Sequence, residues 1–216
     1  MNKLIMATVL TAAVATALTS AAASKHVPER LDNIRLVHPS AARHNHILVS
    51  DVGGAIPPDT WKLVATYAIS RLQLNVWTNA VDAIDVAAYT ADPSKCQKDF
   101  GDKAKICVFL LDDPKSPPFV SVPRRWCAAN VHGLAVDGPN AQTLRDRYAK
   151  TLLKGMAYAC GSGATLEPVC SLFHGTSSLA GMDRTAIIIT PMAYFPMLET
   201  LRALGGSEML TPAMDE

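Results

Sequence analysis

The sequence lacks the short motifs that mark the best-known catalytic sites. It contains no GxSxG, no HExxH, no phosphate-binding GxxxxGK[ST] loop and no GxGxxG after a strand. These patterns carry the serine nucleophile of α/β-hydrolases, a zinc site, a phosphate cradle and a dinucleotide site, respectively. The sequence therefore predicts no catalytic site of these four kinds.

Excess charge of either sign is also missing. The chain has 20 Lys and Arg against 19 Asp and Glu, for a formal net charge of +1. Removing the first 23 residues, which hold one lysine and no acid, brings the net charge to zero. Nucleic-acid binders need a basic face, and anionic membranes attract basic segments. We therefore expect no nucleic-acid partner, and no membrane partner once the N-terminal segment is removed.

The first 23 residues have the pattern of a signal peptide. Lys3 precedes an apolar run over residues 4–18, and Ala21 and Ala23 match a signal-peptidase site. The run is shorter than the roughly 20 residues that cross a bilayer, although a membrane anchor is the alternative. We predict cleavage after Ala23 and export to the periplasm or the cell exterior. The remaining residues 24–216 are enough for one domain with a full core.

The sequence contains no CxxC pair, which disfavours a Cys-rich zinc site. The five cysteines are an odd number. In an exported protein, their spacing across two loop-like segments indicates disulfides Cys96–Cys107 and Cys160–Cys170, with Cys127 left free. The alternative is that all five cysteines are reduced and buried.

Histidines near the mature N-terminus offer one metal-binding alternative. Cleavage after Ala23 would place His26 third, and a free amine, two amides and a third-position histidine can hold Cu(II) or Ni(II) in a square plane. His44 and His46 would share one face of a strand. An incidental role for all three histidines is the simpler interpretation.

Apolar runs and turn signals predict an α/β sandwich with a mixed sheet. We expect strands at residues 46–52, 74–78, 106–111 and 126–131, and helices after Pro57-Pro58 and over residues 193–204. Residues 82–102 are expected to form a short helix and a loop. Residues 115–123 and 171–183 are expected to be loops.

One long helix, predicted over residues 140–161, organises the rest of the chain. Asn140 can cap its first free amides, and Gly161 is a natural stop. Gly155 lies inside the helix and costs roughly 1 kcal/mol relative to alanine, so a compensating reason such as close packing against the sheet is expected. Its charged residues are placed on the solvent side: Arg145, Asp146, Arg147 and Lys150.

The end of this helix resembles a known zinc site. Residues 154–165, KGMAYACGSGAT, align without gaps with the HExxHxxGxxHC motif of archaemetzincins, sharing the turn glycine Gly161 and a later segment that begins with Cys170. The resemblance implies a zincin-like fold, in which a mixed sheet accompanies a long central helix and a C-terminal helix. The alternative is an unrelated α/β domain whose helix also ends in GSG.

The residues that carry the family's chemistry are absent. The resemblance places the three zinc-ligand positions on Lys154, Tyr158 and Ala164, the general base on Gly155, and the methionine below the metal on Leu172. An ammonium, a phenol at its normal pKa and a methyl group are unsuited to zinc, which needs about three protein ligands even in catalytic sites. The resemblance therefore implies no zinc, no other cofactor and no peptidase activity.

The main expectation is a secreted, non-catalytic metzincin-like domain, a pseudoenzyme that binds a peptide or protein in the former substrate cleft. Lys154 and Tyr158 would lie on the floor of that cleft, and an edge strand could pair with an extended ligand. Taken singly, each residue has a simpler interpretation, with Lys154 in solvent and Tyr158 in the core.

An enzyme of different chemistry is the alternative. It would use Cys127 or Cys160 as nucleophile and His132 or His174 as base, with an aspartate orienting the base. The sequence does not fix these residues near one another.

Overall fold

The computed structural model describes residues 47–204 except 73, 75 and 101–104. The predicted signal peptide over residues 1–23 lies outside this part of the chain, and so do His26, His44 and His46.

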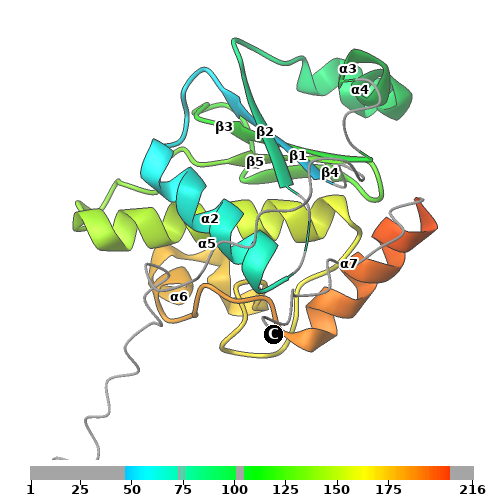
Figure 1. Ribbon diagram of the computed structural model, residues 1–216. Coiled ribbons are helices and arrows are strands. Elements are labelled where there is room, and N and C mark those ends of the chain that lie inside the picture. The colour runs from blue at the N-terminus through cyan, green and yellow to red at the C-terminus, as the bar shows by residue number, and fades with distance from the viewer. Residues whose placement is uncertain (1–46, 73, 75, 101–104, 205–216) are drawn as a thin grey trace, which may run out of the picture. The chain divides into compact units, whose positions relative to one another are not determined.

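A five-stranded mixed sheet runs through the described residues in the order β2-β1-β3-β5-β4 (Figure 1). Strands β1, β2, β3 and β5 run parallel, and β4 pairs antiparallel with β5 at one edge. The mixed α/β sheet predicted from the sequence is confirmed. The strands are β1 (Ile47–Val52), β2 (Val76–Val81), β3 (Ile106–Leu111), β4 (Phe119–Val122) and β5 (Trp126–Asn130).

The helices cover both faces of the sheet. In Figure 1, α2 and α5 lie along one face, and α3 and α4 lie on the other side. None of the described helices is long and apolar enough to cross a membrane. The helices are α2 (Pro58–Ser70), α3 (Val86–Ala91), α4 (Pro93–Phe100), α5 (Ala141–Ala159), the 3₁₀ helix η3 (His174–Ser177), α6 (Leu179–Asp183) and α7 (Pro191–Ala203).

Two apolar cores result from the alternation of side chains along the strands. Ile47 and Val49 of β1 join the core shared with α2, α5 and α7, whereas Leu48 joins the core that contains Tyr89 and Cys96 from α3 and α4. Strand β3 is buried at every position, which explains why its sequence is an uninterrupted apolar run.

Helix α5 begins and ends as its sequence predicts. The Asn140 side chain accepts a hydrogen bond from the Thr143 amide at 2.9 Å. At the other end, Gly161 adopts a φ of 87°, and its amide donates to the Tyr158 carbonyl at 2.9 Å. A positive φ is reached by glycine without steric cost, so Gly161 both ends the helix and redirects the chain.

Gly155 lets α5 approach the sheet closely, as expected from its position inside the helix. A Cβ at this position would lie 3.1 Å from both the Ala129 Cβ and the Val108 Cγ1. Position 155 therefore faces β3 and β5, and a longer side chain has no space there.

The variant Gly155→Glu, which introduces the acid of the zinc-peptidase motif, is expected to lower the free energy of unfolding by about 3 kcal/mol or more. Overpacking alone costs about 1–3 kcal/mol, and the variant adds a buried carboxylate without a partner. Ala141→Glu, at the exposed start of the same helix, is the matched control and should leave stability unchanged. Urea unfolding followed by circular dichroism measures both, and equal stability of the two variants would contradict the close approach.

Three local predictions are wrong. Residues 115–123 were expected to be a loop, but they contain the edge strand β4. Residues 171–183 contain η3 and α6, and residues 82–102 contain two helices in place of one. These elements are short, and contacts with distant segments stabilise them more than their own apolar periodicity does.

Two of the charges placed in solvent are buried. Arg147 is 2% exposed, and Lys150 is buried with its Nζ donating to the Met182 carbonyl at 3.0 Å. Their partners come from segments distant in sequence, which the periodicity of one helix cannot reveal.

The structure contains neither predicted disulfide, and its five cysteines are free thiols, although the side chains of Cys96 and Cys107 are hydrogen-bonded neighbours. Cys160 and Cys170 lie in the core under α5, as does Cys127, and Cys96 and Cys107 lie in the core on the other face of the sheet. A buried thiol packs as a small apolar side chain. Burial of all five cysteines is the part of the alternative that the structure confirms.

Candidate functional site

A cavity of about 520 Å³ lies beside α5 and the edge strand β4. We call it the α5 cavity. Its size falls within the range of small-molecule sites. Its lining residues are Ser116, Pro118, Phe119, Asn130, His132, Gly133, Leu134, Thr151, Lys154, Tyr158, Ala164, His174, Ser177, Ser178, Leu179 and Met182.

The three positions that the resemblance assigns to zinc all line this cavity. Lys154 and Tyr158 come from neighbouring turns of α5, and Ala164 follows the turn at Gly161. Gly155 does not line the cavity, because it faces the sheet. The structure therefore brings the three ligand positions together and separates the general-base position from them.

Lys154 is held in an apolar setting. Only 6% of the residue is exposed, and its Nζ lies 5.8 Å from the centroid of the Phe119 ring, within the range of a cation–π contact. Burial lowers the pKa of Lys154 from its usual value. Its interpretation as a solvent-facing lysine is wrong.

Tyr158 packs edge-on against the same ring. The Tyr158 and Phe119 centroids are 5.2 Å apart with an interplanar angle of 81°. Burial raises the pKa of Tyr158, so its phenol stays protonated at neutral pH. Phe119 of β4 thus contacts two of the aligned ligand positions on α5. Its segment resembles a loop in sequence, so no local signal indicated these contacts.

Thr151 is a cavity residue outside the aligned motif. It is 2% exposed, and its Oγ1 has no hydrogen-bond partner among the described residues. Thr151, Lys154 and Tyr158 are spaced i, i+3 and i+7, so they occupy one face of α5. That spacing was visible in the sequence and could have identified Thr151.

Asn130 fixes the loop on the opposite wall of the cavity. Its Nδ2 donates to the Asp113 and Ser116 carbonyls at 2.8 and 2.7 Å. Its Oδ1 accepts from the Asp113 and His132 amides at 3.2 and 3.0 Å. All four bonds are to backbone, so Asn130 positions this wall and does not offer a free group to a ligand.

The structure does not support the cysteine–histidine alternative. His132 and His174 line the α5 cavity, and His132 Nδ1 lies 2.7 Å from Asp112 Oδ1, which supplies the expected orienting acid. Cys127 and Cys160, however, do not line the cavity, and burial raises the pKa of both thiols to about 12. A buried, protonated thiol is a poor nucleophile.

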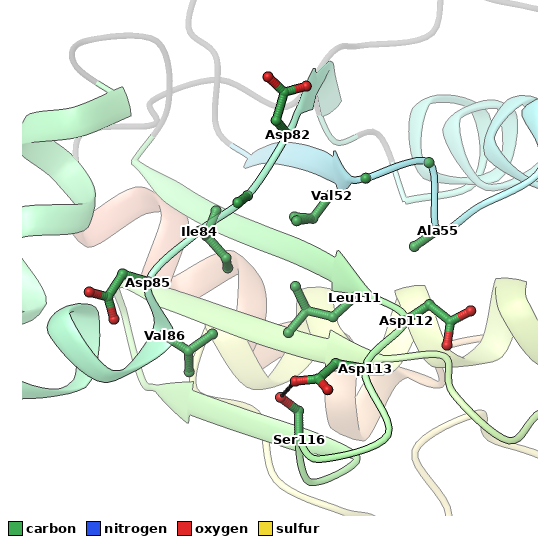
Figure 2. Close-up of a pocket in the computed structure, with 13 residues that line it drawn as sticks. Val52, Ala55, Asp82, Ile84, Asp85, Val86, Leu111, Asp112, Asp113 and Ser116 are labelled. Atoms are coloured by element: carbon green, nitrogen blue, oxygen red, sulfur yellow. Dashed lines mark hydrogen bonds between the residues drawn. The ribbon is translucent and has the colours of Figure 1, made fainter.

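A second cavity, of about 690 Å³, lies at the carboxyl ends of β1, β2 and β3 (Figure 2). Four aspartates line it, but two already serve local turns and caps. Asp85 accepts from the Ala88 amide, and Asp113 accepts from the Ser116 hydroxyl, shown as a dashed line in Figure 2. Although this cavity is larger, it holds none of the motif positions, so the α5 cavity is the better candidate.

Solved structures resemble this chain in fold. An archaemetzincin from Methanopyrus kandleri superposes with a TM-score of 0.57 at 15% identity, covering 76% of this chain and 99% of that one. A zinc-dependent peptidase from Methanocorpusculum labreanum gives 0.53 at 13% identity, covering 69% and 99%. The Archaeoglobus fulgidus archaemetzincin, complexed with malonate, gives 0.50 at 13% identity, covering 70% and 99%.

The chain has an archaemetzincin-like fold. This confirms the zincin-like sandwich that the motif resemblance implied. No protein-family model matches the sequence, and neither does any curated protein.

The fold implies zinc, but the residues present do not fit it. The three ligand positions offer the Lys154 ammonium, the Tyr158 phenol with its raised pKa, and the Ala164 methyl. Zinc prefers imidazole, thiolate and carboxylate donors. Within the described ranges, no group of three or more His, Cys, Asp or Glu side chains could hold a metal ion.

Proposed function

We propose that this chain is an exported, non-catalytic zincin-like domain that binds an extended peptide segment in the α5 cavity. One observation carries the proposal. The three former ligand positions line a single cavity beside an edge strand, yet their side chains are unfit for zinc and the general-base position faces the sheet. The cavity is thus present without the side chains that zinc-dependent peptide hydrolysis needs.

The edge strand supports a peptide ligand. Strand β4 is the last in the sheet, and Phe119 of this strand lines the cavity. The Asn130 amide donates to the Pro118 carbonyl, so residues 118 and 130 form a hydrogen-bonded pair. Pair types alternate along an antiparallel ladder, which leaves the backbone groups of Phe119 and Ser121 facing the open edge. An extended peptide can pair with these groups.

A proline at the edge tests the proposal. Ser121→Pro is expected to weaken peptide binding at least tenfold, because it removes an outward amide while leaving the β4–β5 bonds in place. Ser121→Ala keeps the amide and is the matched control. Fluorescence polarisation with fluorescein-labelled octapeptides ending in Leu, Phe, Ala or Lys measures binding to the mature protein. Circular dichroism checks that both variants fold.

Two outcomes would contradict the proposal. The first is that none of the labelled octapeptides binds the wild-type protein. The second is that folded Ser121→Pro and Ser121→Ala bind them equally well.

A further inference from the structure

The cavity-facing side of α5 presents hydrogen-bond donors. Lys154 carries an ammonium group with three donors and no acceptor, and the Thr151 hydroxyl has no partner among the described residues. Both residues are more than nine-tenths buried. A buried hydroxyl without a partner is costly, and a ligand acceptor beside it would relieve that cost.

Part of the wall around these donors is apolar, and the described lining residues include no acid. Phe119, Leu134, Leu179 and Met182 line the cavity, and no aspartate or glutamate is among its described lining residues. Apart from Lys154 and the weakly acidic Tyr158, the titratable groups lining it are His132 and His174. The described lining residues therefore contribute no carboxylate to the cavity, and an anion with an apolar body matches them.

A carboxylate suits this arrangement better than other common anions. It is planar, has two acceptor oxygens, and makes strong charge-assisted hydrogen bonds with an ammonium group. One oxygen can accept from Lys154 Nζ and the other from Thr151 Oγ1, since the two residues are neighbours on one helix face. The apolar wall can then hold the group that bears the carboxylate.

We propose that the α5 cavity binds the C-terminal carboxylate of a peptide, with Lys154 and Thr151 as its donors and the apolar wall as the site of the last side chain. This inference rests on the proposed function and specifies its ligand. Phe119 lines the cavity and its backbone groups face the open edge of β4, so this edge can supply backbone partners for residues preceding the terminus. A free small carboxylic acid shares the same charged group but cannot use this edge.

Paired probes test the inference. A fluorescein-labelled octapeptide ending in leucine is expected to bind the mature protein at least tenfold more tightly as the free acid than as the C-terminal amide. In Lys154→Met the acid and the amide should bind within about twofold of each other. Thr151→Val keeps the shape of the side chain. It should weaken binding of the free-acid peptide several-fold and leave binding of the amide peptide unchanged. Lys98→Ala removes an exposed lysine on α4 and is the control.

Thermal unfolding verifies that each variant is folded, and Thr151→Val carries the test if Lys154→Met does not fold. Equal binding of acid and amide by the wild-type protein would overturn this inference alone. The inference would also be overturned if both Lys154→Met and Thr151→Val still bound the free-acid peptide more tightly than the amide peptide. If N-acetyl-leucine competed as effectively as the unlabelled octapeptide, the ligand would be a small carboxylic acid and not a peptide. Failure of every peptide to bind would instead contradict the proposed function.

Discussion

A variant combining Lys154→His, Tyr158→His and Ala164→His is expected to bind one zinc ion per chain with a dissociation constant below about 1 µM, which corresponds to about 8 kcal/mol. The three positions line one cavity, and two of them occupy successive turns of α5. Three neutral imidazoles plus water form a common zinc coordination set. Metal analysis after dialysis and competition with a chromophoric chelator measure stoichiometry and affinity.

The double variant Lys154→His with Tyr158→His is the matched control, because it lacks the third ligand and should bind zinc at least tenfold more weakly. If the triple variant binds no more tightly than the double, Ala164 does not occupy the third ligand position. The motif alignment would then be wrong. Zinc binding without peptidase activity is the expected result, since position 155 faces the sheet and cannot present a general base to the cavity.

The variant Asp183→Asn is expected to lower the free energy of unfolding by about 1.5–3 kcal/mol, which is the range for hydrogen bonds to a charged partner. Arg147 is buried and donates five hydrogen bonds: two to Asp183, two to Asp137 and one to the Leu134 carbonyl, at 2.6 to 2.9 Å. Asparagine keeps the shape of the side chain but removes its charge, which leaves a buried guanidinium partly uncompensated. Urea unfolding at pH 7 measures the loss.

The dependence of stability on pH at acid pH gives a second test of the cluster that Arg147 forms with Asp137 and Asp183, here called the Arg147 cluster. Hydrogen bonding to Arg147 lowers the pKa of Asp137 and Asp183 below the ordinary value of about 3.9. A lowered pKa means that this stability is present above about pH 4 and is lost as the pH falls through the folded-state values. The difference between Asp183→Asn and wild type should therefore be largest at neutral pH and shrink below about pH 4.

The exposed Lys98–Asp92 pair provides the control for this prediction. Both side chains are largely exposed, with 3.6 Å between Lys98 Nζ and Asp92 Oδ2. Exposed pairs of this kind contribute little, so Lys98→Ala should leave stability unchanged within error. A similarly small effect of Asp183→Asn would contradict the structural role of the Arg147 cluster.

The predictions from sequence succeeded where local signals and tertiary environment agree. Strand β3 was located to the residue because burial on both faces produces a continuous apolar run. Helix α5 was located because its cap, its apolar stripe and its glycine stop all lie within one segment. The zincin-like fold was predicted from a motif in which the turn glycine is present and the zinc ligands are not.

The remaining features depend on contacts between distant segments. Strand β4 lies between prolines and has only half-buried and exposed residues, so only its pairing with β5 makes it a strand. Arg147 is buried because Asp137 and Asp183 reach it from two other segments. The aromatic contact of Phe119 with Lys154 and Tyr158 depends on the same strand, so the floor of the cavity could not be derived from α5 alone.

Neighbouring residues of helix α5 pack in the core and line the cavity. Leu152, Leu153 and Met156 are fully buried in the core, and they alternate with Thr151, Lys154 and Tyr158 along the same turns. We expect backbone amides in such a buried segment to exchange with solvent mainly through global unfolding. A ligand held by these turns therefore adds RT ln(1 + [L]/Kd) to global stability, so slower amide exchange throughout α5 would report that the cavity is filled.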